Sequence, residues 1–375
     1  MSEYKSWRNN ERVWLKDVVP LDTPFNLHLD VSAVCNARCV YCGQSKTPGK
    51  TMMSMELFEH AIEQAKAFPQ KLKVLDLYYT GESLCNPLFP DMVAKARAAD
   101  VAEKIGVTTN GILLTKEKID GIIAGGINEI RISIQGLDAA AYQRVCGVRI
   151  DYETFLRNLR YLYEHKEQAN VRIKIADVAL HGVEDGEAKF REMFGGIADS
   201  IFVERIVPLY KDVNYDALDK DIQKHAQDGR YAVAQQRVNS VCYRPFIKLL
   251  VATNGDVCAA CCDHISGRDK VYGNIYESTL VDVWQGRVHQ DFMEMQLRGD
   301  RFHHPLCKDC VVPNDIVNER DCLDPFADEV LEKISRLKIK SGGVINFQTF
   351  INLKVHRTRY AEIMYSEKAG RCREA

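Results

Sequence analysis

The strongest constraint on the fold is a regular alternation of short β-rich runs with longer helical patterns between residues 25 and 209. The clearest helical pattern covers residues 151–167, where apolar side chains recur every three to four positions and predict one buried helix face. Six β/α units in succession predict a parallel sheet with crossover helices, as a partial barrel or as an open doubly wound sheet. We expect strands at 25–31, 74–79, 104–109, 129–134, 171–176 and 201–208, and further helices at 55–67 and 115–124.

The distinctive short motifs of this region all follow predicted strands. In both parallel architectures the functional loops lie at the carboxyl ends of the strands, so we expect these motifs to meet on one face of the molecule. In chain order, after the first four strands, they are the cysteines at 35–42, Thr80-Gly81-Glu82, Asn110-Gly111 and Gln135-Gly136.

The length of 375 residues exceeds what one hydrophobic core usually organises, which favours a main domain and a second, smaller one. A charged stretch rich in Tyr and Gln suits a connector between them, and the pattern after Leu323 is helical. We predict an N-terminal arm at 1–24, a barrel at 25–209, a connector at 210–241, a cysteine-rich domain at 242–322 and a helical tail at 323–375.

Composition limits the partners and the cellular location that we expect for this protein. The 50 Lys and Arg residues nearly balance the 52 Asp and Glu residues, so neither nucleic acid nor another polyanion is indicated as a partner. The sequence lacks any run that approaches the roughly 18 apolar residues of a membrane span, and we expect a cytoplasmic protein without a membrane partner. In that compartment 13 cysteines indicate metal binding or chemistry rather than disulfides.

The first cysteine group, Cys35, Cys39 and Cys42, has the spacing C-x3-C-x2-C on a loop directly after the first predicted strand. Three thiolates can hold three corners of a 4Fe-4S cluster and leave the fourth iron open for a small molecule. A structural zinc site with a distant fourth ligand is the alternative, although zinc spacings usually come as two pairs of ligands.

This segment resembles the radical S-adenosylmethionine superfamily, whose motif has an aromatic residue before the last cysteine, here Tyr41. The resemblance implies a partial (β/α)6 TIM-like barrel and cleavage of S-adenosylmethionine to a 5′-deoxyadenosyl radical that abstracts hydrogen from a substrate. Thr80-Gly81-Glu82 is similar to the family loop that holds the methionine amino group, with Thr80 in place of a glycine. By the same resemblance Tyr41, Thr109 and Ser133 are expected to contact the cofactor.

The second cysteine group lies in the last third of the chain. It resembles the SPASM/twitch extension of these enzymes, a small domain that binds auxiliary iron–sulfur clusters. The resemblance implies one auxiliary 4Fe-4S cluster, whose ligands would be Cys242, Cys261, Cys307 and Cys310. Cys258 or Cys262 could replace Cys261 as a ligand. A zinc site is the competing interpretation of this cysteine group.

A single auxiliary cluster is similar to the arrangement in sugar and aminocyclitol enzymes such as 2-deoxy-scyllo-inosamine dehydrogenase. That implies oxidation of an alcohol in a small polyol, sugar or aminocyclitol, with electron transfer to the auxiliary cluster. An external one-electron reductant such as flavodoxin or ferredoxin is implied as a partner. No side chain is assigned as catalytic. The alternatives are a peptide maturase, for which 24 residues before the first strand are too few to form a peptide-binding domain, a sugar epimerase, and a zinc-binding module without activity.

Overall fold

The computed structural model describes residues 13–46, 48–204, 206, 210, 212–215, 218, 239–261, 270–308, 310, 312–314 and 318–340. The predicted N-terminal arm, connector and C-terminal tail therefore lie partly outside the described residues. Cys262, one of the alternative ligands of the auxiliary cluster, lies outside them as well.

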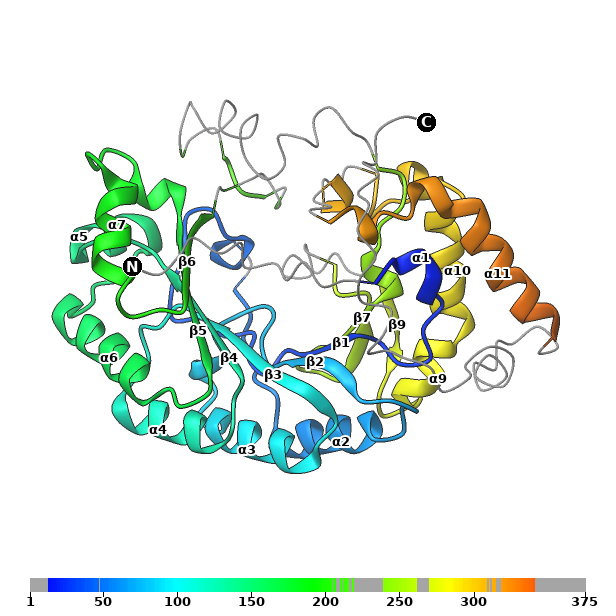
Figure 1. Ribbon diagram of the computed structural model, residues 1–375, viewed down its shortest axis with the longest axis horizontal. Helices are drawn as coiled ribbons and strands as arrows, with labels where there is room; N and C mark the ends of the chain where they lie inside the picture. The colour runs from blue at the N-terminus through cyan, green and yellow to red at the C-terminus, as the bar shows by residue number, and fades with distance from the viewer. Residues whose placement is uncertain are drawn as a thin grey trace.

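The six predicted strands form one parallel sheet in which each strand neighbours the next in sequence. Right-handed crossovers between successive neighbours put all connecting helices on one face, so the sheet curls into a partial barrel rather than a doubly wound sheet. Figure 1 shows this curved sheet with its helices along the convex side. The predicted partial barrel is confirmed. Its strands are β1 (Asn26–Leu29), β2 (Leu72–Asp76), β3 (Ala102–Thr109), β4 (Glu129–Ile134), β5 (Asn170–Ala176) and β6 (Ser200–Glu204).

The crossover helices begin where a side chain can cap their free amide groups. Asp151, for example, accepts a hydrogen bond from the Thr154 amide at 3.0 Å, directly before the helix whose apolar face the sequence predicts. That face is buried through Phe155, Leu159 and Leu162. The helices of the barrel are α2 (Met55–Ala65), α3 (Phe89–Ala99), α4 (Lys116–Ala124), α5 (Ala139–Cys146), α6 (Tyr152–His165) and α7 (Gly186–Phe194).

The two faces of the sheet differ in polarity. Leu27 and Leu29 of β1 are fully buried in the hydrophobic core, and His28 between them points to the opposite, concave face because side chains alternate along a strand. There Asp76 of β2 forms an ion pair with Arg131 of β4. The interior of the partial barrel is therefore polar, while the core lies between the sheet and the helices.

The second region continues the same sheet. Strand β7 (Lys248–Val251) pairs parallel with β1, and β8 (Asp256–Cys258) and β9 (Val271–Asn274) add antiparallel strands beyond it. The helices α9 (Leu280–Gln285), α10 (Arg287–Leu297) and α11 (Ala327–Lys340) pack beside these strands (Figure 1). The cysteine-rich region is thus joined to the barrel through backbone hydrogen bonds, and the domain boundaries stay predictions.

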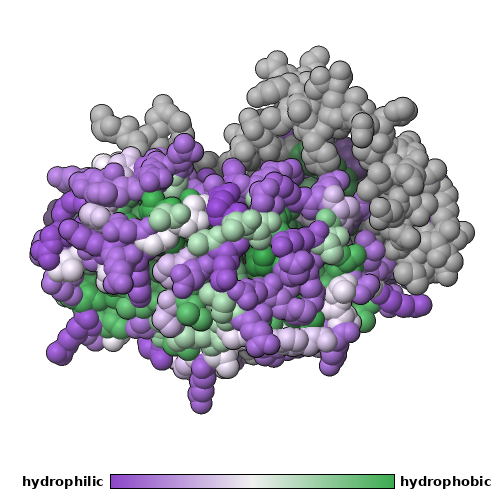
Figure 2. All heavy atoms as spheres, turned by 90° about the horizontal axis from the view of Figure 1, so that it is seen from below, coloured by the Kyte–Doolittle hydropathy of each residue, from purple (hydrophilic) through white to green (hydrophobic). Residues whose placement is uncertain are grey.

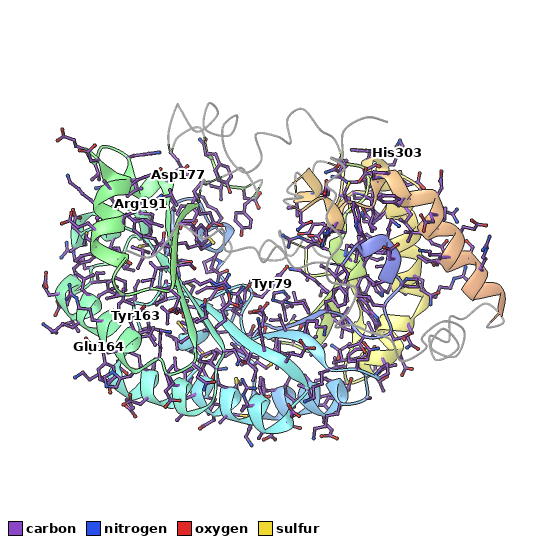
Figure 3. All side chains as sticks on the ribbon, viewed as in Figure 1. Tyr79, Tyr163, Glu164, Asp177, Arg191 and His303 are labelled. Atoms are coloured by element: carbon purple, nitrogen blue, oxygen red, sulfur yellow. The ribbon has the colours of Figure 1, made fainter. Side chains whose placement is uncertain are left out.

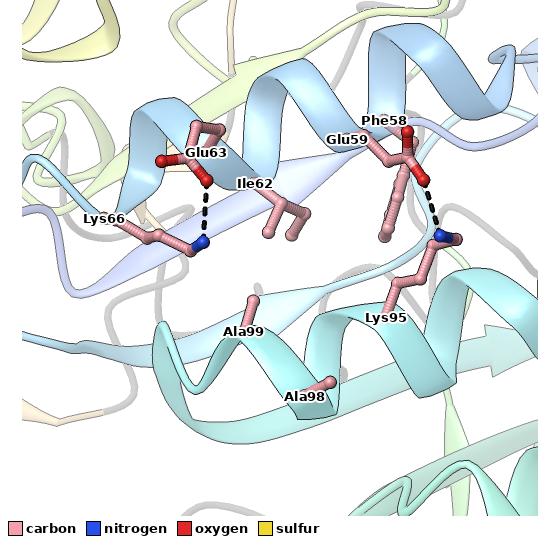
Figure 4. A pocket seen from close by; sticks show the side chains of 8 residues that line it. All are labelled: Phe58, Glu59, Ile62, Glu63, Lys66, Lys95, Ala98 and Ala99. Carbon is pink, nitrogen blue, oxygen red and sulfur yellow. Dashed lines mark hydrogen bonds and ion pairs between the residues drawn. The ribbon is translucent and has the colours of Figure 1, made fainter.

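The outer surface of the barrel is formed by its helical layer. Within the described ranges, no helix is both long enough and apolar enough to cross a bilayer. Seen from below, the helical layer presents a mostly hydrophilic face with scattered apolar patches (Figure 2). A groove between α2 and α3 lies on this outer layer, where Glu59–Lys95 and Glu63–Lys66 ion pairs border it (Figure 4). None of the residues predicted to bind a cofactor lines it.

Candidate active site

The first cysteine loop is held by its backbone at the carboxyl end of the barrel strands. The amides of Arg38 and Val40 donate to the carbonyls of Cys146 and Val145, both at 2.9 Å. These two bonds flank Cys39 and fasten the loop to the end of α5. The sulfur atoms of the triplet therefore stand on a fixed backbone, as cluster ligands require.

The three thiols of this loop are set in an apolar environment. Burial raises the pKa of Cys35 to about 12 and the pKa of Cys42 to about 11. A hydrogen bond with the Cys146 thiol, together with burial, raises the pKa of Cys39 well above its ordinary range. Such thiols form thiolates only when a cation compensates the charge, and iron supplies that charge when it binds. The donor set therefore fits an iron–sulfur cluster.

The Thr80-Gly81-Glu82 segment runs directly beside the chain that leads into Cys35. The Gly81 amide donates to the Ser32 carbonyl at 3.0 Å, and the Glu82 amide donates to the Val34 carbonyl at 2.9 Å. A Cβ atom on Gly81 would lie 2.4 Å from the Val34 carbonyl oxygen, so only glycine fits this approach. The predicted motif is thus placed against the cysteine loop, and Thr80 occupies a position where a side chain is tolerated.

Glu82, the last residue of this segment, carries a buried carboxylate and is 3% exposed. It accepts hydrogen bonds from the Thr109 hydroxyl at 2.6 Å, the Asn110 amide at 2.7 Å and the Leu84 amide at 3.1 Å. Burial raises its pKa, against the lowering effect of these donors. A carboxylate held this way can accept a further bond from an ammonium group, which is the role that the family resemblance implies for it.

The remaining predicted contacts lie around the same loops. The Tyr41 hydroxyl donates to Gln135, two residues beyond Ser133, which is half-buried near the end of β4. The Thr109 hydroxyl is engaged by Glu82 and by the Gly111 amide. Whether Tyr41, Thr80, Gly81, Glu82, Thr109 and Ser133 contact the cofactor stays a prediction.

Sequence reasoning missed three partners in this site. Gln135 fixes Tyr41, Asn36 accepts a hydrogen bond from the Asn110 side chain at 2.7 Å, and Cys146 lies against Cys39. Asn36 and Gln135 belong to motifs that the sequence singles out, so their polar side chains were a usable signal. Cys146 ends a helix and carries no local signal, because only the packing of α5 brings it there.

The second cysteine group is assembled from distant segments. Burial, together with nearby charge on Cys310 and Cys307, raises the pKa of Cys242 to about 12. Gln296 of α10, fully buried, links two of these cysteines: its Oε1 atom accepts from the Cys242 amide at 3.2 Å, and its Nε2 atom donates to Cys307 Sγ at 3.5 Å. Cys242, Cys307 and Cys310 therefore lie together, as predicted for an auxiliary site.

A buried arginine completes this arrangement. The Arg301 guanidinium, 2% exposed, donates to the carbonyls of Asn239, Cys307 and Cys310. The planar guanidinium thereby fixes both ends of the C-x2-C pair to the chain that precedes Cys242. Neither Gln296 nor Arg301 was predicted, because each acts on groups far away in the sequence.

The candidates for the fourth auxiliary ligand differ in their surroundings. Cys258, 1% exposed, lies on β8 in a small apolar cluster with Leu250 and Ala260. Cys261 is half-buried, and its carbonyl accepts a hydrogen bond from the Tyr79 hydroxyl at 2.8 Å. The assignment of Cys261 stays a prediction.

The described cysteines are all reduced. None of the eleven forms a disulfide, and no group of three or more His, Cys, Asp or Glu side chains among the described residues could hold a single metal ion.

Family comparisons agree with both cysteine groups. The model described as Radical SAM superfamily matches residues 29–194, and the model described as Iron-sulfur cluster-binding domain, SPASM, matches residues 242–311. By these matches the chain contains a radical S-adenosylmethionine domain, followed by a SPASM domain. Its cofactors are accordingly S-adenosylmethionine and the 4Fe-4S cluster that binds it, together with auxiliary iron–sulfur clusters in the SPASM domain.

Individual relatives are distant. A tungsten-containing aldehyde ferredoxin oxidoreductase cofactor-modifying protein of Pyrococcus furiosus is 24% identical over 316 residues, which cover 76% of this chain and 86% of the relative. The structure of Streptococcus suis SuiB bound to S-adenosylmethionine is 16% identical, covers 80% of this chain and 73% of that one, and has a TM-score of 0.56. The structure of anSMEcpe with bound AdoMet is 14% identical, covers 85% and 98%, and has a TM-score of 0.54. At these identities the structural likeness shows the fold alone.

Proposed function

We propose that this protein is a radical S-adenosylmethionine oxidoreductase that oxidises an alcohol carbon of a small polyol, sugar or aminocyclitol. The observation that carries the proposal is the contact between the loop after β2 and the second cysteine region, made by Tyr79 and Cys261. This contact brings the predicted cofactor loop and the predicted auxiliary loop to the same end of the barrel. In the proposal Cys35, Cys39 and Cys42 hold the first cluster, and Cys242, Cys261, Cys307 and Cys310 hold the auxiliary cluster.

The protein's own residues divide the work of this reaction. When bound, the first cluster and S-adenosylmethionine would supply a radical that can take a hydrogen atom from a carbinol carbon. The auxiliary cluster would supply an acceptor for the electron that is released when the hydroxyl proton leaves and the carbonyl forms. Glu82 binds and orients the methionine ammonium group through the lone pair on Oε2 that its three hydrogen bonds leave open. Thr109 and the Asn110 amide hold the Glu82 carboxylate in position.

The concave face of the barrel supports a polar substrate. Its polar lining includes the Asp76–Arg131 ion pair and His28, whose Nε2 atom lies 3.9 Å from the Asp76 carboxylate. A lining of charged and hydrogen-bonding side chains suits a substrate rich in hydroxyl groups better than an apolar one.

Anaerobic reconstitution followed by deuterium transfer tests the proposal. We expect a brown protein with about eight irons that forms 5′-deoxyadenosine under a strong reductant. With a panel of polyols, sugars and aminocyclitols deuterated at their carbinol carbons, we expect deuterium in 5′-deoxyadenosine and a ketone product in equal amounts.

Control variants separate the parts of this test. Glu82→Gln keeps the shape of the side chain and removes its charge, so we expect a raised KM for S-adenosylmethionine and an unchanged iron content. Lys95→Gln, in the distant outer groove, should match the wild type. Deuterium transfer from a precursor peptide and from none of the small alcohols would replace the proposal with a peptide maturase, and return of the label to the substrate would replace it with an epimerase. Two bound zinc ions without cofactor cleavage would refute it.

A further inference from the structure

The four residues 79–82 contact both cysteine regions of the molecule. On one side, the amides of Thr80, Gly81 and Glu82 donate to Asp30 Oδ1, the Ser32 carbonyl and the Val34 carbonyl, at distances from 2.9 to 3.1 Å. This side of the segment is therefore attached to the chain that enters the first cysteine loop. On the other side, the Tyr79 hydroxyl donates to the Cys261 carbonyl at 2.8 Å.

Tyr79 is well placed to act on the second region. Figure 3 shows it between the barrel strands and the helices of that region. Its ring packs edge-on against His28, with centroids 5.0 Å apart, and against the apolar cluster of Leu250, Cys258 and Ala260. These two contacts restrain the ring, so the hydroxyl has a defined direction.

The backbone that receives this hydrogen bond is strained. Ala260, directly before Cys261, has a φ of 55°, in the left-handed region that residues other than glycine rarely adopt. Such a conformation persists only where the surroundings determine it. The hydrogen bond from Tyr79 to the next carbonyl is one contact that keeps the turn between Cys258 and Cys261 in this shape.

We propose that Tyr79 is a positioning residue for the auxiliary cluster: by fixing the backbone of Cys261 it sets where that ligand stands relative to the cofactor loop. The inference rests on the proposed function, because it takes Cys261 as a ligand and the auxiliary cluster as the electron acceptor. Tyr79 acts through Cys261 and is given no contact with the reacting atoms.

The variant Tyr79→Phe removes only the hydroxyl and keeps the ring in its packing. We expect an altered electron paramagnetic resonance signal and midpoint potential of the auxiliary cluster, with the signal of the first cluster unchanged. With a substrate, the ketone formed per 5′-deoxyadenosine should fall roughly fivefold, about what the loss of one hydrogen bond gives. Formation of 5′-deoxyadenosine without substrate should stay at the wild-type rate.

Two further variants keep the test decisive. Tyr276→Phe removes the hydroxyl of a tyrosine in the same region that is 60% exposed, and it should match the wild type in every measurement. Tyr79→Leu also removes the ring and should lower the iron content by up to one cluster. The inference is wrong if Tyr79→Phe leaves the auxiliary signal and the coupling unchanged, or if it disturbs both clusters equally. The spectroscopic measurements need no substrate, so they stand even if alcohol oxidation fails in the wild type.

Discussion

The two cysteine groups are held in place by different kinds of contact. Cys35, Cys39 and Cys42 lie on one short loop after β1, and backbone hydrogen bonds from Arg38 and Val40 fasten that loop to α5. The second group instead gathers residues separated by more than sixty positions. Its members are joined by side chains, those of Gln296 and Arg301.

This difference shows which substitutions each region can tolerate. In the first region the ligand spacing is local, so the site depends on the cysteines and on the backbone beneath them. In the second region the site depends equally on two buried polar side chains that bind no metal. Loss of such a buried side chain leaves its partners unpaired, which is costly in a dry interior. We expect the second region to be the more sensitive to substitutions away from its cysteines.

The largest effect is expected in the first region. Cys39→Ala removes a proposed ligand, and formation of 5′-deoxyadenosine should fall by on the order of 10³-fold or more because the cofactor carries the chemistry. The auxiliary signal should persist. Cys146→Ala, at the thiol adjacent to Cys39, is the matched control and should retain the first cluster. Equal losses in both variants would break the distinction between a ligand and its neighbour. Activity is measured by chromatography of the nucleoside product.

An intermediate effect is expected from Arg301→Leu in the second region. It leaves the carbonyls of Asn239, Cys307 and Cys310 without their donor, and the local stability should fall by about 3 kcal/mol. Iron content should drop by about half while substrate-free cleavage of S-adenosylmethionine continues.

The matched control for this change is Arg298→Leu. That arginine is 55% exposed and pairs with Glu294 one helical turn away, an ion pair that contributes about 0.5 kcal/mol or less. Full iron content in Arg301→Leu would show that the second region, like the first, is held by its backbone. Iron is measured by colorimetric assay beside the cofactor cleavage rate.

The smallest effect concerns the barrel interior beneath the first region. Burial lowers the pKa of His28 from 6.5 to about 3, against the raising effect of Asp76. Between these values the unfolded chain binds a proton that the folded protein does not, so stability falls as the pH falls below 6.5. This residue should lower the free energy of unfolding by about 1 kcal/mol between pH 6.5 and 5.5.

Urea unfolding at the two pH values measures this contribution. His28→Asn should lose that part of the pH dependence. His303→Asn, at an exposed histidine of the second region, should keep the wild-type dependence. The same slope in all three proteins would mean that the barrel interior does not discriminate against the charged imidazole.

The elements that the sequence predicts best are those whose pattern is local. The alternation at Leu27 and Leu29, the apolar stripe of α6 and the spacing of the first cysteines are each complete within a few consecutive residues. Helix α10 shows the opposite case. Its buried face includes His289, Gln290 and Gln296 beside its apolar residues, so its helical periodicity is masked in the sequence.

The sequence alone therefore determined the parallel β/α sheet, the first cysteine loop and the presence of a second cysteine region. Each of these follows from periodicity or from spacing along the chain. Only the tertiary structure decided that the second region extends the sheet at β1, that Arg301 and Gln296 bind its cysteine segments, and that Tyr79 meets Cys261. These contacts join residues far apart in sequence, and a buried hydrogen bond between distant groups leaves no periodic trace in either segment.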